Sequence, residues 1–294
     1  MTSFIPSDSK VIDIKNLNFT YRKSGKHAIK GIDFSIHKGE IFGFLGPSGA
    51  GKTTTQRLII GLLKGYKGQI DVLGRERHLW DKEFFEHIGV AFDFPNLYLK
   101  LTAKENLQLI GSYYSAKPSN LDELFDQVGL LKDKDMRVEN YSKGMKMRLN
   151  FIRSIMHEPD IMFFDEPTAG LDPVNAKIIK DKILDMKAKG KTIFLTTHNM
   201  TVAEQLCDRV SFINEGVLSA TDTPSNLMIE HGNAYVDVSY YDGISKNHGR
   251  FPLVTLNENA AFKDIVNNHK IITIHSGEAT LEDIFIKFTG RALI

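Results

Sequence analysis

Nine consecutive residues have the types and the spacing that bind phosphate groups: Gly46-Pro47-Ser48-Gly49-Ala50-Gly51-Lys52-Thr53-Thr54. A glycine, four further residues and then Gly-Lys-Thr are typical of loops that hold nucleoside triphosphates. Glycines let backbone N–H groups turn toward the phosphates, and a following helix directs the positive end of its dipole at them. Lys52 supplies a charge for the β- and γ-phosphates and is expected to act in catalysis, while the Thr53 hydroxyl suits Mg²⁺.

The residues on either side of this run predict the strand-to-helix turn that such a loop requires. Glu40–Leu45 is an apolar run of strand length, and Thr54–Leu63 has apolar residues at helical spacing. A glycine-rich turn that binds nothing is the plain alternative, and the strand-loop-helix context argues against it.

Two acids at the end of a second apolar run have the chemistry that phosphoryl transfer needs. Ile161–Phe164 indicates a buried parallel strand, and Asp165 and Glu166 follow it directly. Ligands of open α/β sheets bind at this carboxyl end of the strands. We expect Asp165 to hold Mg²⁺ through water, and Glu166 to be the general base that polarises the attacking water. A solvated strand end is the alternative.

Further motifs follow in order along the chain, and together they resemble the nucleotide-binding subunit of an ABC transporter. Tyr141–Met145 resembles the signature motif, in the form found in the branch that handles drugs, antibiotics, peptides and sodium. Ala169–Pro173 resembles the D-loop, and Thr196–His198 resembles the segment of the switch histidine. Tyr21 falls where the family stacks an aromatic ring on adenine. The similarity continues through Cys207–Val210 and covers nearly the whole chain.

The resemblance implies a composite site between two copies. In the family, the helix that begins at the signature motif, here Ser142, Gly144 and Met145, caps ATP held by the phosphate loop of a second subunit. The expectation is therefore a head-to-tail dimer, here a homodimer, with a heterodimer as the alternative. His198 is expected to contact the γ-phosphate and to help position the water. An ordinary helix cap at Ser142, a structural histidine and a core role for Tyr21 are the alternatives.

One position departs from the family pattern. In the family, the strand that corresponds to Ile88–Phe92 runs into a glutamine that touches Mg²⁺ and senses the membrane partner, and this chain has Asp93 there. Carboxylates are ordinary ligands of this ion, so we expect Asp93 to coordinate Mg²⁺ directly or through water. Its shorter stem and its charge near the γ-phosphate are expected to slow closure. A solvated loop acid is the alternative.

The chain is long enough for about two domains, with 294 residues of which 42% are hydrophobic. We expect an α/β fold: a P-loop NTPase core with a mixed β-sheet, an inserted helical subdomain and a small C-terminal α+β extension. The ATP-binding domain is predicted at residues 10–225, with the helical subdomain at about 96–157, and the C-terminal accessory domain at 226–294. In that extension, Thr280–Phe288 has the pattern of a capped amphipathic helix, and Phe251–Val254 that of a strand.

Charge and hydropathy limit the classes of partner and the compartment. A net charge of +1 gives no electrostatic reason to expect nucleic acid as a partner. The one cysteine, Cys207, fits a reducing compartment. No run approaches 18 apolar residues, and the N-terminus lacks the pattern of a signal peptide. We therefore expect a cytoplasmic protein, peripheral on the cytoplasmic face of the membrane, with any translocation path in a separate permease.

The resemblance implies an ATPase that uses ATP and Mg²⁺ to power export through an integral membrane permease on another chain. ATP binding would close the dimer, and hydrolysis would reset it. Apolar contacts to a cytoplasmic helix of the permease are expected from Phe92, Phe94, Leu97 and Tyr98. One alternative is a soluble ABC-type ATPase that serves a cytosolic assembly or a regulatory process. Another is a nucleotide-sensing module that barely hydrolyses ATP, and Glu166 argues against it.

Overall fold

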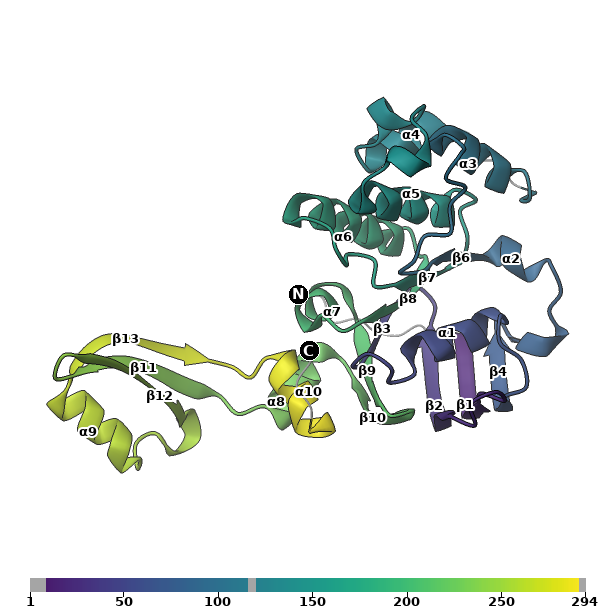
Figure 1. Ribbon diagram of the computed structural model, residues 1–294. Helices are drawn as coiled ribbons and strands as arrows, with labels where there is room; N and C mark the ends of the chain where they lie inside the picture. The colour runs from purple at the N-terminus through teal and green to yellow at the C-terminus, as the bar shows by residue number, and fades with distance from the viewer. Residues whose placement is uncertain (1–8, 116–119, 291–294) are drawn as a thin grey trace. The chain divides into compact units, whose positions relative to one another are not determined.

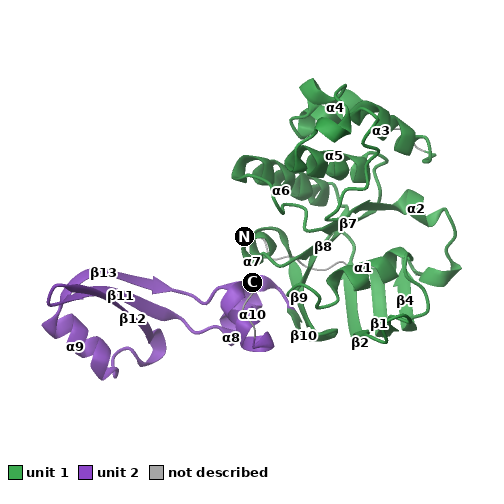
Figure 2. Ribbon diagram, viewed as in Figure 1, with its two compact units in different colours: residues 1–221 green, residues 222–294 purple. Residues whose placement is uncertain are grey.

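The computed structural model describes residues 9–115 and 120–290. The chain divides into two compact units, residues 1–221 and 222–294 (Figure 2). Each unit has its own hydrophobic cluster.

The first unit contains an antiparallel sheet of four strands in the order β2-β1-β4-β5. These strands are β1 (Lys10–Thr20), β2 (His27–His37), β4 (Lys67–Val72) and β5 (Arg75–Glu76). Apolar side chains of β1, β2 and β4 are buried on one face, in the partial alternation that a half-covered sheet gives. This sheet carries the hairpin between β1 and β2, which reaches the candidate site.

A second sheet of six strands in the order β10-β9-β3-β8-β7-β6 forms the centre of the first unit. Its strands are β3 (Ile41–Leu45), β6 (Ile88–Ala91), β7 (Ile161–Asp165), β8 (Thr192–Thr197), β9 (Arg209–Asn214) and β10 (Val217–Asp222). β3 is parallel to β8 and β9, and β7 is parallel to β6 and β8. Every residue of β3, β7 and β8 is buried, which explains why their sequences are continuous apolar runs.

Helix α1 (Lys52–Ile60) lies against the four-stranded sheet (Figure 1) and shares one hydrophobic cluster with both sheets. The expected helix over 54–63 is wrong at both ends. It begins earlier, at Lys52, and it ends at Ile60 because Gly61 takes a φ of +85°. The Arg77 guanidinium donates to the carbonyls of Ile59 and Ile60 at 3.1 and 2.6 Å. A Cβ at Gly61 would lie 2.2 Å from this guanidinium, so the glycine is required for the cap.

A helical part follows β6 and lies at the top of Figure 1. It contains α3 (Ala103–Gly111), α4 (Leu121–Gln127) and α5 (Lys143–Ile155). The expected capping box between Thr102 and Glu105 is present at the start of α3. Other helices of the first unit are α2 (Phe84–His87), α6 (Pro173–Ala188), α7 (Met200–Leu206) and the 3₁₀ turns η1 (Arg77–Leu79), η2 (Leu131–Asp133) and η3 (Val138–Asn140).

The second unit contains a three-stranded antiparallel sheet in the order β12-β11-β13. Its elements are α8 (Pro224–His231), β11 (Tyr235–Asp242), β12 (Ser245–Pro252), η4 (Leu253–Thr255), α9 (Ala260–Asn268), β13 (Lys270–Gly277) and α10 (Leu281–Thr289). The strand expected at Phe251–Val254 is wrong in extent, because β12 begins at Ser245 and a 3₁₀ turn starts at Leu253. The capped helix expected from Thr280 is present as α10.

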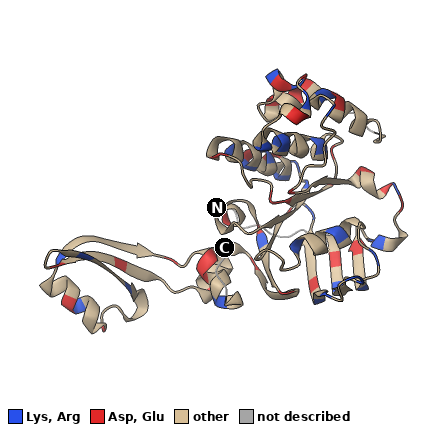
Figure 3. Cartoon of the chain, in the orientation of Figure 1, with Lys and Arg blue, Asp and Glu red and all other residues tan. Residues whose placement is uncertain are grey.

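Charged residues of both signs are interspersed along the elements (Figure 3). Among the residues that the structure describes, none of the helices has the length and hydropathy to cross a bilayer.

Gln56 of α1 allows a test of the packing between the sheets. Its side chain is 0% exposed, and neither amide atom has a hydrogen-bond partner among the described residues. Burial of an unpaired amide is unfavourable, so we expect Gln56→Met to raise the free energy of unfolding by about 1 kcal/mol. Thermal unfolding followed by circular dichroism measures this change.

The neighbouring residue provides the control for Gln56→Met. Thr55 is also 0% exposed, but its hydroxyl donates to the Gly51 carbonyl at 3.0 Å. Thr55→Val should therefore lower the stability. A lower melting temperature for Gln56→Met would mean that its amide is paired in solution.

Candidate nucleotide-binding site

A cavity of about 410 Å³ lies where the predicted phosphate loop meets the carboxyl ends of the buried strands. Its volume is in the range of small-molecule sites. It is lined by Tyr21, Lys26, Ala28, Ser48, Gly49, Gly51, Lys52, Thr53, Thr54, Asp93, Asp165, Glu166 and His198. The structure thus brings together most of the residues that the sequence marked for chemistry, from segments as far apart as residues 21 and 198.

The phosphate loop connects β3 to α1, and its glycines are needed for its course. Gly49 and Gly51 have φ angles of +79° and +121°. A Cβ on Gly46 would lie 2.2 Å from the Ile213 carbonyl oxygen, and one on Gly51 would lie 2.8 Å from the Ile29 side chain. No side chain caps the start of α1, so its first N–H groups are left for an anion. Gly46, Pro47 and Ala50 belong to the loop but do not line the cavity.

Lys52 is folded back over the loop. Its ammonium donates to the carbonyls of Gly46 and Pro47, at 2.6 and 3.1 Å, and its side chain is largely buried. Burial lowers the pKa of Lys52 from its ordinary value, and the charges of Glu166 and Asp165 oppose this effect. These three groups face one cavity, so a phosphate that entered would meet an ammonium already held near it.

Asp165 is fixed by two hydroxyls. Its Oδ2 accepts from Thr53 Oγ1 at 3.0 Å, and its Oδ1 accepts from Thr196 Oγ1. Thr53 and Asp165 thus form a pair of hard oxygen donors beside the phosphate loop, which suits Mg²⁺. The described residues contain no group of three or more His, Cys, Asp or Glu that could hold a metal ion. This donor set fits an ion that binds mainly through substrate phosphates and water.

Glu166 is held by the last residue of β8 and by the residue that follows it. Its Oε1 accepts from the His198 backbone N–H at 2.9 Å and lies 2.6 Å from His198 Nδ1. Its Oε2 accepts from Thr197 Oγ1 at 2.8 Å. The φ angle of Glu166 is +51°, which is unfavourable for a residue with a Cβ and is typical of functional sites. The structure therefore orients this carboxylate at some cost in backbone energy.

Tyr21 and Lys26 come from the hairpin that joins β1 to β2. The Tyr21 hydroxyl is 3.0 Å from Thr54 Oγ1, and its ring meets the edge of Phe19 at a centroid distance of 4.9 Å. Lys26 is exposed at the same cavity, and Ala28 lines it as well. Lys26 and Ala28 were not predicted from the sequence. The pairing of β1 with β2 is the signal that places them beside Tyr21.

Three predicted residues lie away from this cavity. Ser142 is the N-cap of α5, and its hydroxyl accepts from the Met145 N–H at 3.2 Å. Gly144 is close to Leu171, since a Cβ there would lie 3.4 Å from that side chain. Within one chain, none of these three residues, Ser142, Gly144 and Met145, lines the cavity that holds Lys52.

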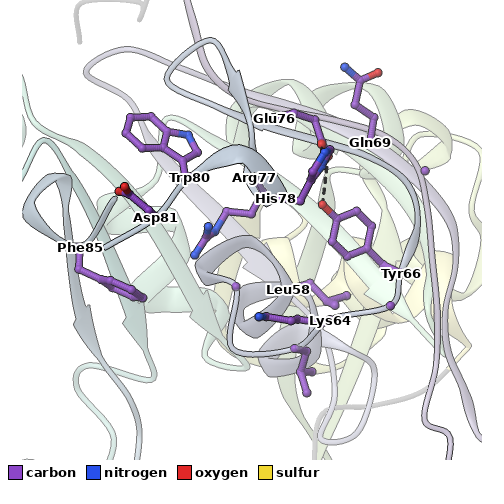
Figure 4. A pocket seen from close by; sticks show the side chains of 14 residues that line it. Leu58, Lys64, Tyr66, Gln69, Glu76, Arg77, His78, Trp80, Asp81 and Phe85 are labelled. Carbon is purple, nitrogen blue, oxygen red and sulfur yellow. Dashed lines mark hydrogen bonds and ion pairs between the residues drawn. The ribbon is translucent and has the colours of Figure 1, made fainter. Parts of the chain in front are cut away.

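A larger cavity, of about 890 Å³, lies at the other end of α1 (Figure 4). The Tyr66 hydroxyl donates to Glu76 at 3.1 Å on one side, and Trp80 and Phe85 lie on the other. The Arg77 guanidinium at its centre already donates to the last carbonyls of α1. This cavity lacks acids at the ends of buried strands, so phosphate chemistry belongs to the smaller cavity.

Comparison with known proteins agrees with this geometry. Residues 29–169 match the protein family described as "ABC transporter". A "Fluoroquinolones export ATP-binding protein" of Mycobacterium tuberculosis (strain CDC 1551 / Oshkosh) is 47% identical over 97% of this chain and 95% of its own length. A "Bacitracin transport ATP-binding protein" of Bacillus licheniformis is 31% identical over 96% of this chain and 98% of its own length.

Solved structures confirm the expected fold class. An ATP-binding cassette described as dimeric, in a post-hydrolysis state with ADP and Pi, is 25% identical, with a TM-score of 0.66. The match covers 72% of this chain and 98% of the solved chain. The resemblance inferred from the motifs is thereby confirmed: this chain belongs to the ABC transporter family, as an ATP-binding subunit that hydrolyses ATP to ADP and phosphate.

Proposed function

We propose that this chain powers export through a separate integral membrane permease, and that it works as a homodimer on the cytoplasmic face of the membrane. The observation that carries the proposal is the position of Glu166, fixed by Thr197 and His198 in the same cavity as Lys52. Such a carboxylate suits hydrolysis rather than nucleotide sensing alone. Export is supported by the named activity of the relative that is 47% identical.

In this proposal each residue of the cavity has a different role in the transfer of the γ-phosphoryl group to water. The N–H groups of the loop and Lys52 bind the phosphates, and Tyr21 stacks on the adenine. Glu166 accepts a proton from the attacking water, and His198 positions that water near the γ-phosphate. Because Thr197 and the His198 N–H fix both carboxylate oxygens, Glu166 needs little reorganisation to act.

Mg²⁺ is the metal that we assign to this site. When bound, it neutralises negative charge on the β- and γ-phosphates. Thr53 and Asp165 would hold it, directly and through water, and Asp93, which lines the same cavity, would add a third oxygen.

A head-to-tail homodimer would complete the site. In one chain, Ser142, Gly144 and Met145 are away from the cavity, at the start of an α5 whose dipole can act on an anion. A second copy would bring this segment to the γ-phosphate. The dimeric state of the similar ATP-binding cassette supports this arrangement.

The permease would bind beside Asp93, where apolar side chains are exposed. Phe94 is 80% exposed and Tyr98 is 51% exposed, while Phe92 and Leu97 are partly buried. Large exposed apolar side chains in one loop are typical of protein interfaces.

We also propose two domains for this chain. Residues 10–225 act as the ATP-binding domain, and residues 226–294 act as an accessory domain.

Glu166→Gln tests the assignment of the general base. We expect kcat for ATP hydrolysis to fall by about 10²- to 10⁴-fold, because the amide cannot accept the proton. ATP binding should persist, since the phosphate loop is unchanged, and the dimer should accumulate with ATP. Phosphate release and size-exclusion chromatography measure the two effects.

Glu204→Gln is the matched control for Glu166→Gln. It makes the same chemical change at an exposed position of α7, away from the cavity. Hydrolysis by Glu166→Gln at the wild-type rate would remove Glu166 from the mechanism.

Asp93→Ala tests whether the carboxylate of Asp93 contributes to Mg²⁺ binding. If Asp93 holds Mg²⁺ directly or through water, the Mg²⁺ concentration for half-maximal hydrolysis should rise by roughly 10-fold. Asp93→Gln restores the family residue, keeps an oxygen and removes the charge, so it should speed turnover relative to wild type. Mg²⁺ titrations of the ATPase rate decide the matter. An unchanged Mg²⁺ dependence and rate in Asp93→Ala would identify a solvated loop acid.

Co-purification tests whether this chain binds an integral membrane permease. Tagged Glu166→Gln protein, extracted from native membranes in mild detergent with ATP and Mg²⁺, should bring down a stoichiometric multi-span membrane protein. Mass spectrometry identifies it, with an untagged strain as control. Recovery of soluble partners alone, by intact ATP-bound protein, would instead favour an ATPase of a cytosolic assembly.

A further inference from the structure

The loop that carries Asp93, residues 92–98, is held by helices rather than by the sheet. The last residue of the preceding strand β6 that pairs with the sheet is Ala91, which pairs with Phe164 of β7. Beyond this pair, the Asn150 amide donates to the Phe92 carbonyl at 2.9 Å, and the Arg153 guanidinium donates to the Asn96 carbonyl at 2.6 Å. Both side chains belong to α5.

A third side chain holds the far end of the loop. Asn106 of α3 accepts from the Tyr98 N–H at 2.8 Å and donates to the Tyr98 carbonyl at 3.0 Å. Asn106 and Asn150 are each 1% exposed. The helical part of the unit therefore fixes the backbone of the loop at Phe92, Asn96 and Tyr98.

Asn150 and Arg153 act as one unit. The Asn150 Oδ1 accepts from Arg153 at 2.5 Å, so each donor that reaches the loop is oriented by the other side chain. Burial lowers the pKa of Arg153 from its ordinary value. A guanidinium placed between carbonyl oxygens is costly to desolvate, and its strong charge-assisted hydrogen bonds offset that cost.

We propose that Asn150 and Arg153 are positioning residues, which couple the location of Asp93 in the nucleotide cavity to helix α5. Asn150 lies about 12 Å along the helix axis from Ser142, at 1.5 Å per residue. A rigid helix therefore moves its signature end and the Asp93 loop together. The inference rests on the proposed function, because it gives a geometric link between the permease surface at Phe94 and the ATP site.

The test uses two substitutions in the full-length protein. Asn150→Asp keeps the acceptor for Arg153 and nearly the same shape, but it cannot donate to the Phe92 carbonyl. Arg153→Lys keeps the charge, but its single ammonium cannot bridge Asn150 and the Asn96 carbonyl in the same geometry. Each variant removes one of the two attachments of the loop to α5.

Hydrogen exchange in the ATP-free protein is the first readout. We expect the amides of residues 92–99 to exchange roughly 3- to 10-fold faster in both variants, as the loss of one hydrogen bond predicts. The amides within α5 should keep their wild-type rates. In ATPase assays, the KM for Mg-ATP should rise by roughly 3- to 10-fold, while ATP affinity without Mg²⁺ stays unchanged.

Ser154→Ala is the matched control. Ser154 is also buried on α5, and its hydroxyl donates to the Phe151 carbonyl rather than to the loop. Unchanged exchange of residues 92–99 in both test variants, or an equal effect in Ser154→Ala, would overturn the proposal. Failure of Asn150→Asp to fold would leave Arg153→Lys to decide.

The exchange result does not depend on the proposed function. A wild-type protein that associates with no permease would contradict export, yet the exchange rates would still decide whether α5 holds the loop.

Discussion

The parallel register of β3, β8 and β7 is the constraint on which the site depends. Leu45 pairs with Thr197, and Asp165 pairs with Thr196, so three strands end at one level of the sheet. The phosphate loop leaves β3 at this level, and the acids leave β7 there. Because all three strands are buried throughout, a shift of one residue would disrupt close packing on both faces of the sheet. Core packing therefore determines where the phosphate loop and the two acids lie relative to each other.

The last two residues of β8, both threonines, hold two different acids. Thr196 holds Asp165, and the next residue, Thr197, holds Glu166. Adjacent residues of a strand point to opposite faces, so adjacent hydroxyls can orient adjacent acids in different directions. One carboxylate is directed toward Thr53, and the other toward His198. In the proposed function, these different hydrogen-bond partners separate the acid that would hold Mg²⁺ from the acid that would act as general base.

The sequence predicted the parts of the site whose signals are local. The phosphate loop, the buried strands and the caps at Thr102 and Thr280 depend on residues within one or two turns of each other. The end of α1 was predicted too late because Gly61, within the apolar run, takes a left-handed φ, and Arg77, sixteen residues further on, bonds the last carbonyls. Lys26 was not predicted because it belongs to no motif, although the Tyr21 N–H donates to its carbonyl at 2.9 Å and both residues line the cavity. The backbone conformation of one helix end and one hairpin, rather than the residue pattern, decided these details.

Aspartate at position 93 gives the backbone of its loop unusual importance. The carboxylate of Asp is one methylene nearer to its own backbone than the amide of a glutamine would be. If Asp93 holds Mg²⁺ as proposed, the loop backbone would have to lie closer to the ion than a glutamine would require. Three buried or half-buried side chains of the helical part hold that loop at both ends. A short side chain is thus combined with a firmly held backbone. In this arrangement the position of the helices that hold the loop, rather than the length of the side chain, determines where the Asp93 carboxylate lies.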